Sequence, residues 1–173
     1  MSEEKRSFSR VQARLTAYVR KVDSLETPPI FSSAPALEAC SREVLSRGGK
    51  LPEPLVNFLC EMDKKLDQIL SFLSQDQIRN DFPMSIEIFE LSGAGIKFRT
   101  SAPLVVGDKV ELVLVLNQFP LRLAGTKGRI VGVEEDTGML RLEFMNISEA
   151  DLENIIQYVF QRQREMIRNA KRS

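Results

Sequence analysis

The apolar residues of this chain follow a two-residue period in two separate regions. Residues 10–20 alternate strictly, and one face of this segment is apolar: Val11, Ala13, Leu15, Ala17 and Val19. The same period returns between residues 84 and 144. Successive side chains of a β-strand point to opposite faces, so the alternation predicts strands that are buried on one face only. Such strands are typical of antiparallel sheets and barrels.

The second region contains six strand signals, which lie at residues 84–88, 94–98, 110–116, 121–123, 128–133 and 140–144. Gly107-Asp108 and Asp136-Thr137-Gly138 supply turns between them. We therefore expect an antiparallel meander that forms a small barrel, so the fold class is mainly β with helices.

A helical pattern separates the first strand from the others. A short helix can begin near residue 33, and Gly48-Gly49 supplies a left-handed end for it. Pro52 and Pro54 then begin a longer helix over residues 52–74. Its apolar residues are spaced alternately four and three apart, as in a coiled-coil heptad: Leu55, Leu59, Met62, Leu66, Ile69 and Leu73.

This heptad seam has two interpretations. A Leu/Ile/Met stripe usually packs on its own domain. Here Val56, Phe58, Leu70 and Phe72 widen the apolar surface beyond what one flanking helix covers, which favours self-association through helix 52–74. Because Leu, Met and Ile mix at both core positions, the seam does not fix the number of chains.

The last segment is helical again. Ser148 can cap a helix whose first turns are acidic and whose last turns are basic, as the helix dipole favours. One stripe of this helix is apolar and is expected to lie on the sheet: Leu152, Ile155, Ile156, Val159, Phe160 and Ile167.

The composition excludes several kinds of site. The chain has no histidine and only two cysteines, Cys40 and Cys60, so the usual ligands cannot assemble a zinc site. Nucleophiles that depend on a histidine base are also excluded. No GxxxxGK[ST] or GxGxxG motif for phosphate or dinucleotide binding occurs. We expect no catalytic residues, no metal and no cofactor.

Charge and hydropathy limit the partners and the location. The chain has 24 basic and 24 acidic residues, but the stretch from Lys5 to Lys21 holds six basic residues and no acid. This local excess favours a small polyanion over DNA. The longest aliphatic run, residues 112–116, is too short to cross a bilayer, and the N-terminus lacks a secretory signal. We expect a cytoplasmic protein without membrane insertion.

Two short motifs resemble those of the PilZ domain family. Arg6-Ser7-Phe8-Ser9-Arg10, directly ahead of the first strand, is similar to the RxxxR motif of that family. Glu90-Leu91-Ser92-Gly93-Ala94-Gly95 is similar to its [D/N]xSxxG motif, with Glu in place of Asp or Asn. The resemblance covers residues 5–22 and 83–168, and the helical insertion lies outside it.

The resemblance implies a six-stranded antiparallel PilZ-type barrel that binds cyclic diguanylate (cyclic di-GMP) where the two motifs meet. The expected parts are an N-terminal segment with the first strand (1–22), a helical-hairpin insertion (23–82), the remaining barrel strands (83–146) and a C-terminal helix (147–173). The insertion is similar to that of the tetrameric PilZ branch, in which a heptad-bearing helix assembles four chains.

The chemistry of the ligand fits these residue types. Arg6 and Arg10 could fork onto a phosphate or onto the N7 and O6 acceptors of guanine. Glu90 could accept from the guanine donors, Ser92 could bind a base or a phosphate, and Gly95 could allow close approach of the backbone. Alternatively, Ser92-Gly93-Ala94-Gly95 is only a hairpin turn and the arginines are solvated charges.

Three functions are therefore considered. The first is a cyclic di-GMP receptor that forms a homo-oligomer, either a tetramer or a dimer, and relays the second messenger to a protein partner. The second is a nucleotide-independent adaptor that works through its coiled coil. The third is a small-barrel enzyme, for instance a flavin-binding split barrel, which would purify yellow.

Overall fold

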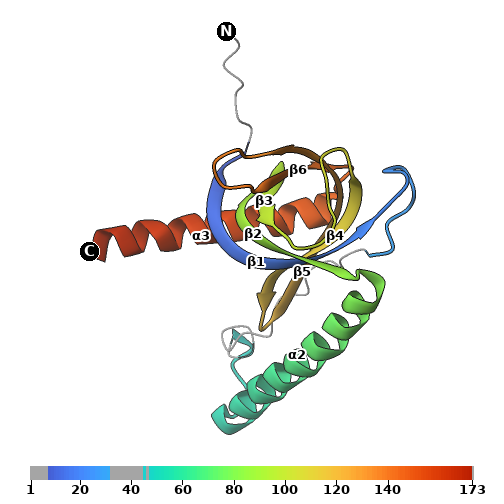
Figure 1. Cartoon of the computed structure of the whole chain (residues 1–173). Helices are drawn as coiled ribbons and strands as arrows, with labels where there is room; N and C mark the ends of the chain where they lie inside the picture. Colours follow the sequence, from blue (N-terminus) through green and yellow to red (C-terminus); the bar gives the residue numbers. More distant parts are fainter. Residues whose placement is uncertain (1–7, 32–44, 46, 173) are drawn as a thin grey trace.

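The computed structural model describes residues 8–31, 45 and 47–172. Six strands form one closed barrel, α3 crosses one end of it, and α2 extends away from its wall (Figure 1). In chain order the elements are β1 (Arg10–Lys21), α2 (Glu53–Asp81), β2 (Met84–Ser92), β3 (Gly95–Arg99), β4 (Lys109–Gln118), β5 (Leu121–Val133), β6 (Leu140–Met145) and α3 (Glu149–Arg172).

The predicted six-stranded antiparallel barrel with a helical insertion after the first strand and a C-terminal helix is confirmed. The strand order is β1-β2-β3-β6-β5-β4, and every neighbouring pair is antiparallel. The prediction of a simple meander is wrong at one connection, because β3 pairs with β6 rather than with β4. The barrel closes where β1 pairs with the first half of β4.

The strand signals at residues 121–123 and 128–133 belong to a single strand, β5. The two-residue period is lost between Ala124 and Gly128 because all five residues are buried. One side of this stretch faces the barrel interior, while the ring of Phe31 covers Gly125 from outside. A strand that is covered on both faces shows no alternation in its sequence.

The helix that carries the heptad seam is longer than predicted and ends at Asp81 rather than at residue 74. Its end is anchored on the outer face of the barrel, where Ile78 and Phe82 belong to one buried cluster with Tyr18, Val113 and Val115. The first predicted helix of the insertion lies mostly outside the described residues. Gly49 has φ +67°, in agreement with the predicted left-handed end.

The C-terminal helix begins as predicted, since the Ser148 hydroxyl accepts a hydrogen bond from the Asp151 N–H at 3.1 Å. Ile155 and Val159 are buried in the barrel core. Phe160 and Ile167 are exposed instead, and beyond Val159 the helix continues past the edge of the barrel (Figure 1). The apolar stripe therefore lies on the sheet only in the first half of the helix. Neither described helix is long and apolar enough to span a membrane.

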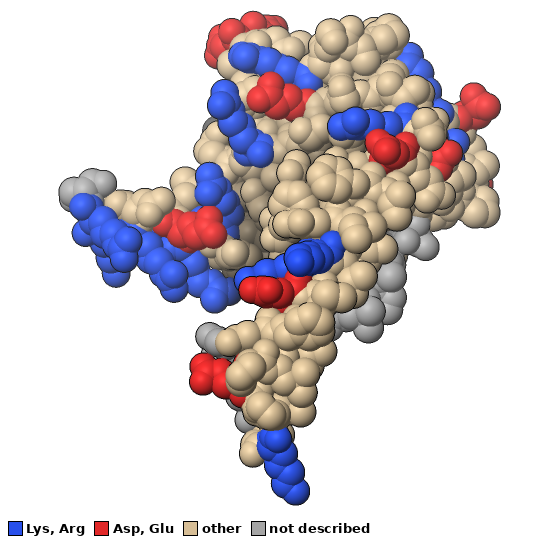
Figure 2. Space-filling view, turned by 90° about the horizontal axis from the view of Figure 1, so that it is seen from below, with Lys and Arg blue, Asp and Glu red and all other residues tan. Residues whose placement is uncertain are grey.

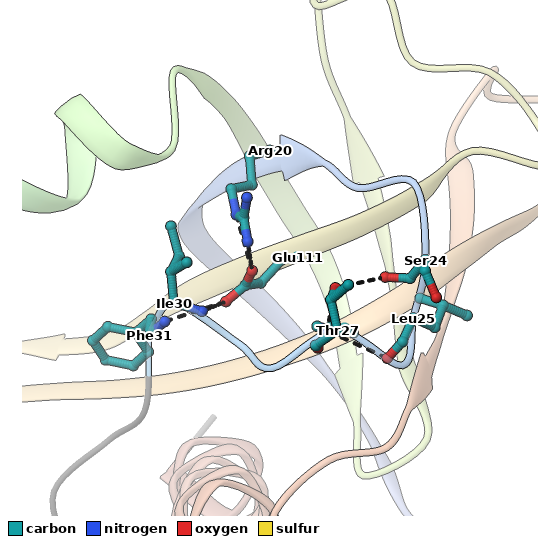
Figure 3. A network of polar contacts seen from close by, with 8 residues as sticks. Arg20, Ser24, Leu25, Thr27, Ile30, Phe31 and Glu111 are labelled. Carbon is teal, nitrogen blue, oxygen red and sulfur yellow. Dashed lines mark hydrogen bonds and ion pairs between the residues drawn. The ribbon is translucent and has the colours of Figure 1, made fainter.

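A polar network fixes the loop that follows β1. The Glu111 carboxylate accepts hydrogen bonds from the Arg20 guanidinium at 2.9 Å and from the N–H groups of Ile30 and Phe31 at 2.8 and 3.2 Å (Figure 3). The Lys127 ammonium donates to the carbonyl oxygens of Leu25 and Thr27. The loop thus covers the outer side of β4 and β5.

Candidate ligand-binding site

The structure brings the described end of the N-terminal motif next to the serine-glycine motif. β1 and β2 are neighbours, and Arg10 lies opposite Ser92 in their register. The Arg10 Nη1 is 3.7 Å from the Glu90 Oε1. Arg6 lies outside the described residues. Of the five predicted ligand-binding residues, four therefore lie at the same corner of the barrel.

Glu90 lies between two cations. Its Oε1 faces Arg10, and its Oε2 is 3.7 Å from the Lys97 Nζ. Lys97 also forms an ion pair with Glu134 at 3.2 Å. Sequence reasoning missed Lys97, although a hairpin with its turn at Gly93-Ala94 brings Lys97 opposite Glu90, as observed. The site therefore holds more positive charge than the RxxxR motif alone supplies.

Ser92 is 6% exposed and its hydroxyl is used within the turn. The Oγ accepts a hydrogen bond from the Ala94 N–H at 3.2 Å and donates to the Gly95 carbonyl oxygen at 3.3 Å. These are the contacts of a serine that stabilises a hairpin turn. Ser92 thereby fixes the end of β2, two residues beyond Glu90.

At Gly93 and Gly95, neighbouring residues leave no room for a side chain. A side chain at Gly95 would collide with the backbone carbonyl oxygen of Leu142 on β6. A side chain at Gly93 would enter the ring of Phe8. Phe8 lies in the middle of the RxxxR motif, so its ring connects the described part of that motif, residues 8–10, to the turn. Sequence reasoning assigned no function to Phe8, and no pattern in the sequence pairs it with Gly93.

A cavity of ≈ 490 Å³ opens beside Arg10 and Glu90. One wall consists of β1 and β2, and the other is the end of α3 that extends past the barrel. The lining residues are Arg10, Val11, Gln12, Glu90, Gln163, Met166 and Ile167. The volume is typical of small-molecule sites. The α3 wall was missed because the whole apolar stripe of that helix was expected to lie on the sheet.

Near this site, the pKa of one carboxyl group, that of Glu134, is shifted. Hydrogen bonds from the Thr137 hydroxyl and from Lys97 lower the pKa of Glu134 below its usual value. Among the residues that the structure describes, no three His, Cys, Asp or Glu side chains gather in a way that could hold a metal ion. The polar groups of the cavity suit an organic ligand with hydrogen-bond donors and acceptors.

Residues 74–161 match the family model of the PilZ domain. The chain belongs to the PilZ domain family. The matched half of the chain begins in α2, includes β2 to β6 and ends in α3. It leaves out β1 and the N-terminal motif. Lys97 and the serine-glycine turn lie within the matched PilZ region, whereas Arg10 does not.

Solved structures similar to this PilZ chain include the Bacillus subtilis inhibitor of motility MotI/DgrA, with a TM-score of 0.51, 12% identity, and coverage of 94% of this chain and 53% of that chain. The PilZ chain thus spans about half the length of MotI. A pathogenic protein from Xanthomonas campestris, described as a tetrameric PilZ domain self-assembled via a helical bundle, gives a TM-score of 0.51, 17% identity, and coverage of 94% and 90%.

The PilZ domain of Escherichia coli YcgR with cyclic di-GMP gives a TM-score of 0.41, 15% identity, and coverage of 52% of this chain and 79% of that chain. At 12% and 17% identity, the likenesses to MotI and to the Xanthomonas campestris protein show the fold alone. The sequence has no match among curated proteins.

Proposed function

We propose that the chain is a receptor for cyclic di-GMP that binds without catalysis and relays the second messenger to a protein partner. The observation that carries this proposal is that Arg10 and Glu90, one from each motif, line the same cavity. Membership of the PilZ domain family supports the class of ligand. Cyclic di-GMP acts as a second messenger in the cytoplasm, so we propose that the receptor is cytoplasmic as well.

The contact between Arg10 and Glu90 is loose, so both side chains could exchange it for contacts with a ligand. At 3.7 Å the two groups attract each other without a good hydrogen bond. On ligand binding the Arg10 guanidinium would turn to a phosphate or a guanine edge, and the Glu90 carboxylate would accept from the guanine N1 and N2 donors. Met166 and Ile167 offer apolar surface for a base.

Arg6, Ser92 and Gly95 complete the proposed site in different ways. Arg6 would add a second guanidinium from the N-terminal segment. Ser92 and Gly95 would shape the turn that holds Glu90 against the cavity, because their contacts are made within the barrel wall. The extra methylene of Glu90, compared with the Asp of the family motif, would be accommodated by its contact with Lys97.

Titration calorimetry with cyclic di-GMP tests this proposal. We expect saturable binding by the intact chain and no binding by Arg10→Ala. Arg14→Ala is a matched control, because Arg14 lies on the same strand and makes a similar loose pair with Glu87 at 3.8 Å but does not line the cavity. The absence of heat at high protein concentration, or an equal loss in both variants, contradicts the proposal.

We also propose that α2 assembles the chain into a homo-oligomer. The six seam residues, Leu55, Leu59, Met62, Leu66, Ile69 and Leu73, are 37% to 64% exposed. Phe58, Leu70 and Phe72 are also exposed and continue this apolar face. An apolar surface of this extent favours association with another protein surface. The helical-bundle tetramer described for the Xanthomonas campestris protein supports a second copy as that partner.

Light scattering of the intact protein tests the assembly. We expect a dimer or tetramer, and a monomer for Leu66→Asp, because a carboxylate in the seam would be buried without a partner. Lys64→Asp is the control, since this exposed residue of α2 lies outside the seam and the variant introduces the same side chain. A monomeric intact protein contradicts the assembly.

A nucleotide-independent adaptor is the second candidate. It is favoured by the turn itself, because the Ser92 hydroxyl and the close approach at Gly95 are used within the barrel. The two candidates differ in the calorimetric titration. An oligomer that does not bind cyclic di-GMP supports the adaptor, whereas binding that depends on Arg10 supports the receptor.

A further inference from the structure

The end of α3 is strongly basic, although the chain as a whole has no net charge. Residues 160–172 contain five basic residues and one acid, a net charge of +4, whereas the whole chain balances 24 against 24. Figure 2 shows Lys and Arg side chains gathered along the part of α3 that extends past the barrel. Four of these basic residues are exposed: Arg164, Arg168, Lys171 and Arg172.

The same end of α3 exposes apolar side chains beside these cations. Phe160, Met166 and Ile167 are 51%, 44% and 56% exposed. Phe160 and Ile167 are two helical turns apart, so they lie on one side of the helix. Arg164 and Lys171 each follow one of these residues by four positions and therefore lie next to them on the helix surface. This side thus combines apolar anchors with flanking cations.

We propose that the end of α3 docks on an anionic membrane surface. Phe160 and Ile167 would enter the boundary between headgroups and acyl chains, and Arg164, Arg168 and Lys171 would contact lipid phosphates. A helix with an apolar side and flanking cations binds in this manner, parallel to the membrane plane and without spanning it. Each cation near an anionic leaflet adds to the attraction.

The observations favour a membrane over the other anionic partners. A soluble polyanion would use the cations but would leave Phe160 and Ile167 in water. An acidic protein would need a groove to cover Phe160 and Ile167, whereas a membrane takes up exposed apolar side chains without one. The end of α3 extends beyond the barrel (Figure 1), and of the two apolar anchors Ile167 also lines the cavity beside Arg10. Membrane docking requires neither bound nucleotide nor assembly through α2, but a nucleotide in the cavity and a membrane would compete for the Ile167 side chain.

Sedimentation with lipid vesicles tests the proposal on the full chain. We expect binding to phosphatidylcholine vesicles that contain phosphatidylglycerol, weak binding to pure phosphatidylcholine, and weaker binding at high salt. Reversal of two charges in Arg164→Glu/Arg168→Glu should lower the affinity by at least about tenfold. The control Arg14→Glu/Arg129→Glu makes the same change in net charge at exposed positions of the barrel and should bind like the intact protein.

A fluorescence measurement tests the insertion of the apolar side. The chain contains no tryptophan, so Phe160→Trp introduces a single tryptophan, which can be excited selectively, at the proposed contact. We expect its emission to shift to shorter wavelength with the anionic vesicles. No sedimentation of the intact protein, an equal loss in both double variants, or bound protein with unshifted emission overturns the proposal. Binding to polyglutamate but not to vesicles also overturns it and assigns the surface to an acidic protein.

Discussion

Glu111 of β4 and Lys127 of β5 lie directly opposite each other in the barrel wall. The two residues are 1% and 4% exposed. Both contact the loop after β1, the carboxylate through the N–H groups of Ile30 and Phe31 and the ammonium through carbonyl oxygens. Arg20 supplies a cation to the carboxylate. The pair thus holds the start of the helical insertion on the barrel.

Glu111→Gln should destabilise the protein although it preserves the shape of the side chain. The variant leaves the half-buried Arg20 without its anion and weakens the hydrogen bonds to the loop. A hydrogen bond to a charged group contributes about 1.5 to 3 kcal/mol, so a loss of about 3 kcal/mol in the free energy of unfolding is expected. Urea denaturation measures it. Glu87→Gln removes an exposed carboxylate that also pairs with an arginine, and an equal loss there contradicts a special role of Glu111.

The local patterns of the sequence predicted the elements, but not the contacts between distant segments. The alternation in β1 and the cap at Ser148 depend on neighbouring residues and were predicted. The pairing of β3 with β6 and the contact of Arg20 with Glu111 join residues far apart in the chain, and no local pattern encodes them. β5 was divided in two because the loop held by Glu111 and Lys127 covers its outer face.

The candidate site was predicted in part for the same reason. Arg10 and Glu90 were found because motifs identify residue types at fixed spacing. The packing of Phe8 on Gly93 and the α3 wall of the cavity depend on the tertiary fold, which brings three separate segments together. The same fold gives Gly95 a close neighbour within the barrel, Leu142, where a ligand had been expected.

Gly95→Ala should destabilise the barrel, because the added methyl group collides with the backbone of β6. The backbone of a sheet cannot move aside as a flexible side chain can, so a loss of about 1 to 3 kcal/mol in the free energy of unfolding is expected. Thermal unfolding measures the change. Gly48→Ala is the control, since a side chain there meets open space and should leave the midpoint nearly unchanged. Equal midpoints for both variants contradict the close approach.

The stability should decrease in acid partly through Glu134. The Thr137 hydroxyl and Lys97 lower the pKa of Glu134 in the folded protein below its unfolded value. A depressed pKa stabilises the folded state above the unfolded pKa, and this contribution is lost as the pH falls through the folded pKa. Glu134→Gln should therefore show a shallower loss of stability below about pH 5. Denaturation at several pH values measures the slope, and an unchanged slope contradicts the assignment.

Phe8→Ala should weaken cyclic di-GMP binding without unfolding the barrel. The Phe8 ring packs on Gly93 and so holds residues 8–10 beside the turn. Without the Phe8 ring, these residues must become ordered when the ligand binds. Immobilising one side chain costs about 1 kcal/mol, which corresponds to about a fivefold loss of affinity. Calorimetry measures this loss. Phe119→Ala removes an exposed ring at the turn between β4 and β5 and is the control. If Phe8→Ala binds as tightly as the intact chain, the N-terminal segment is not positioned by this contact.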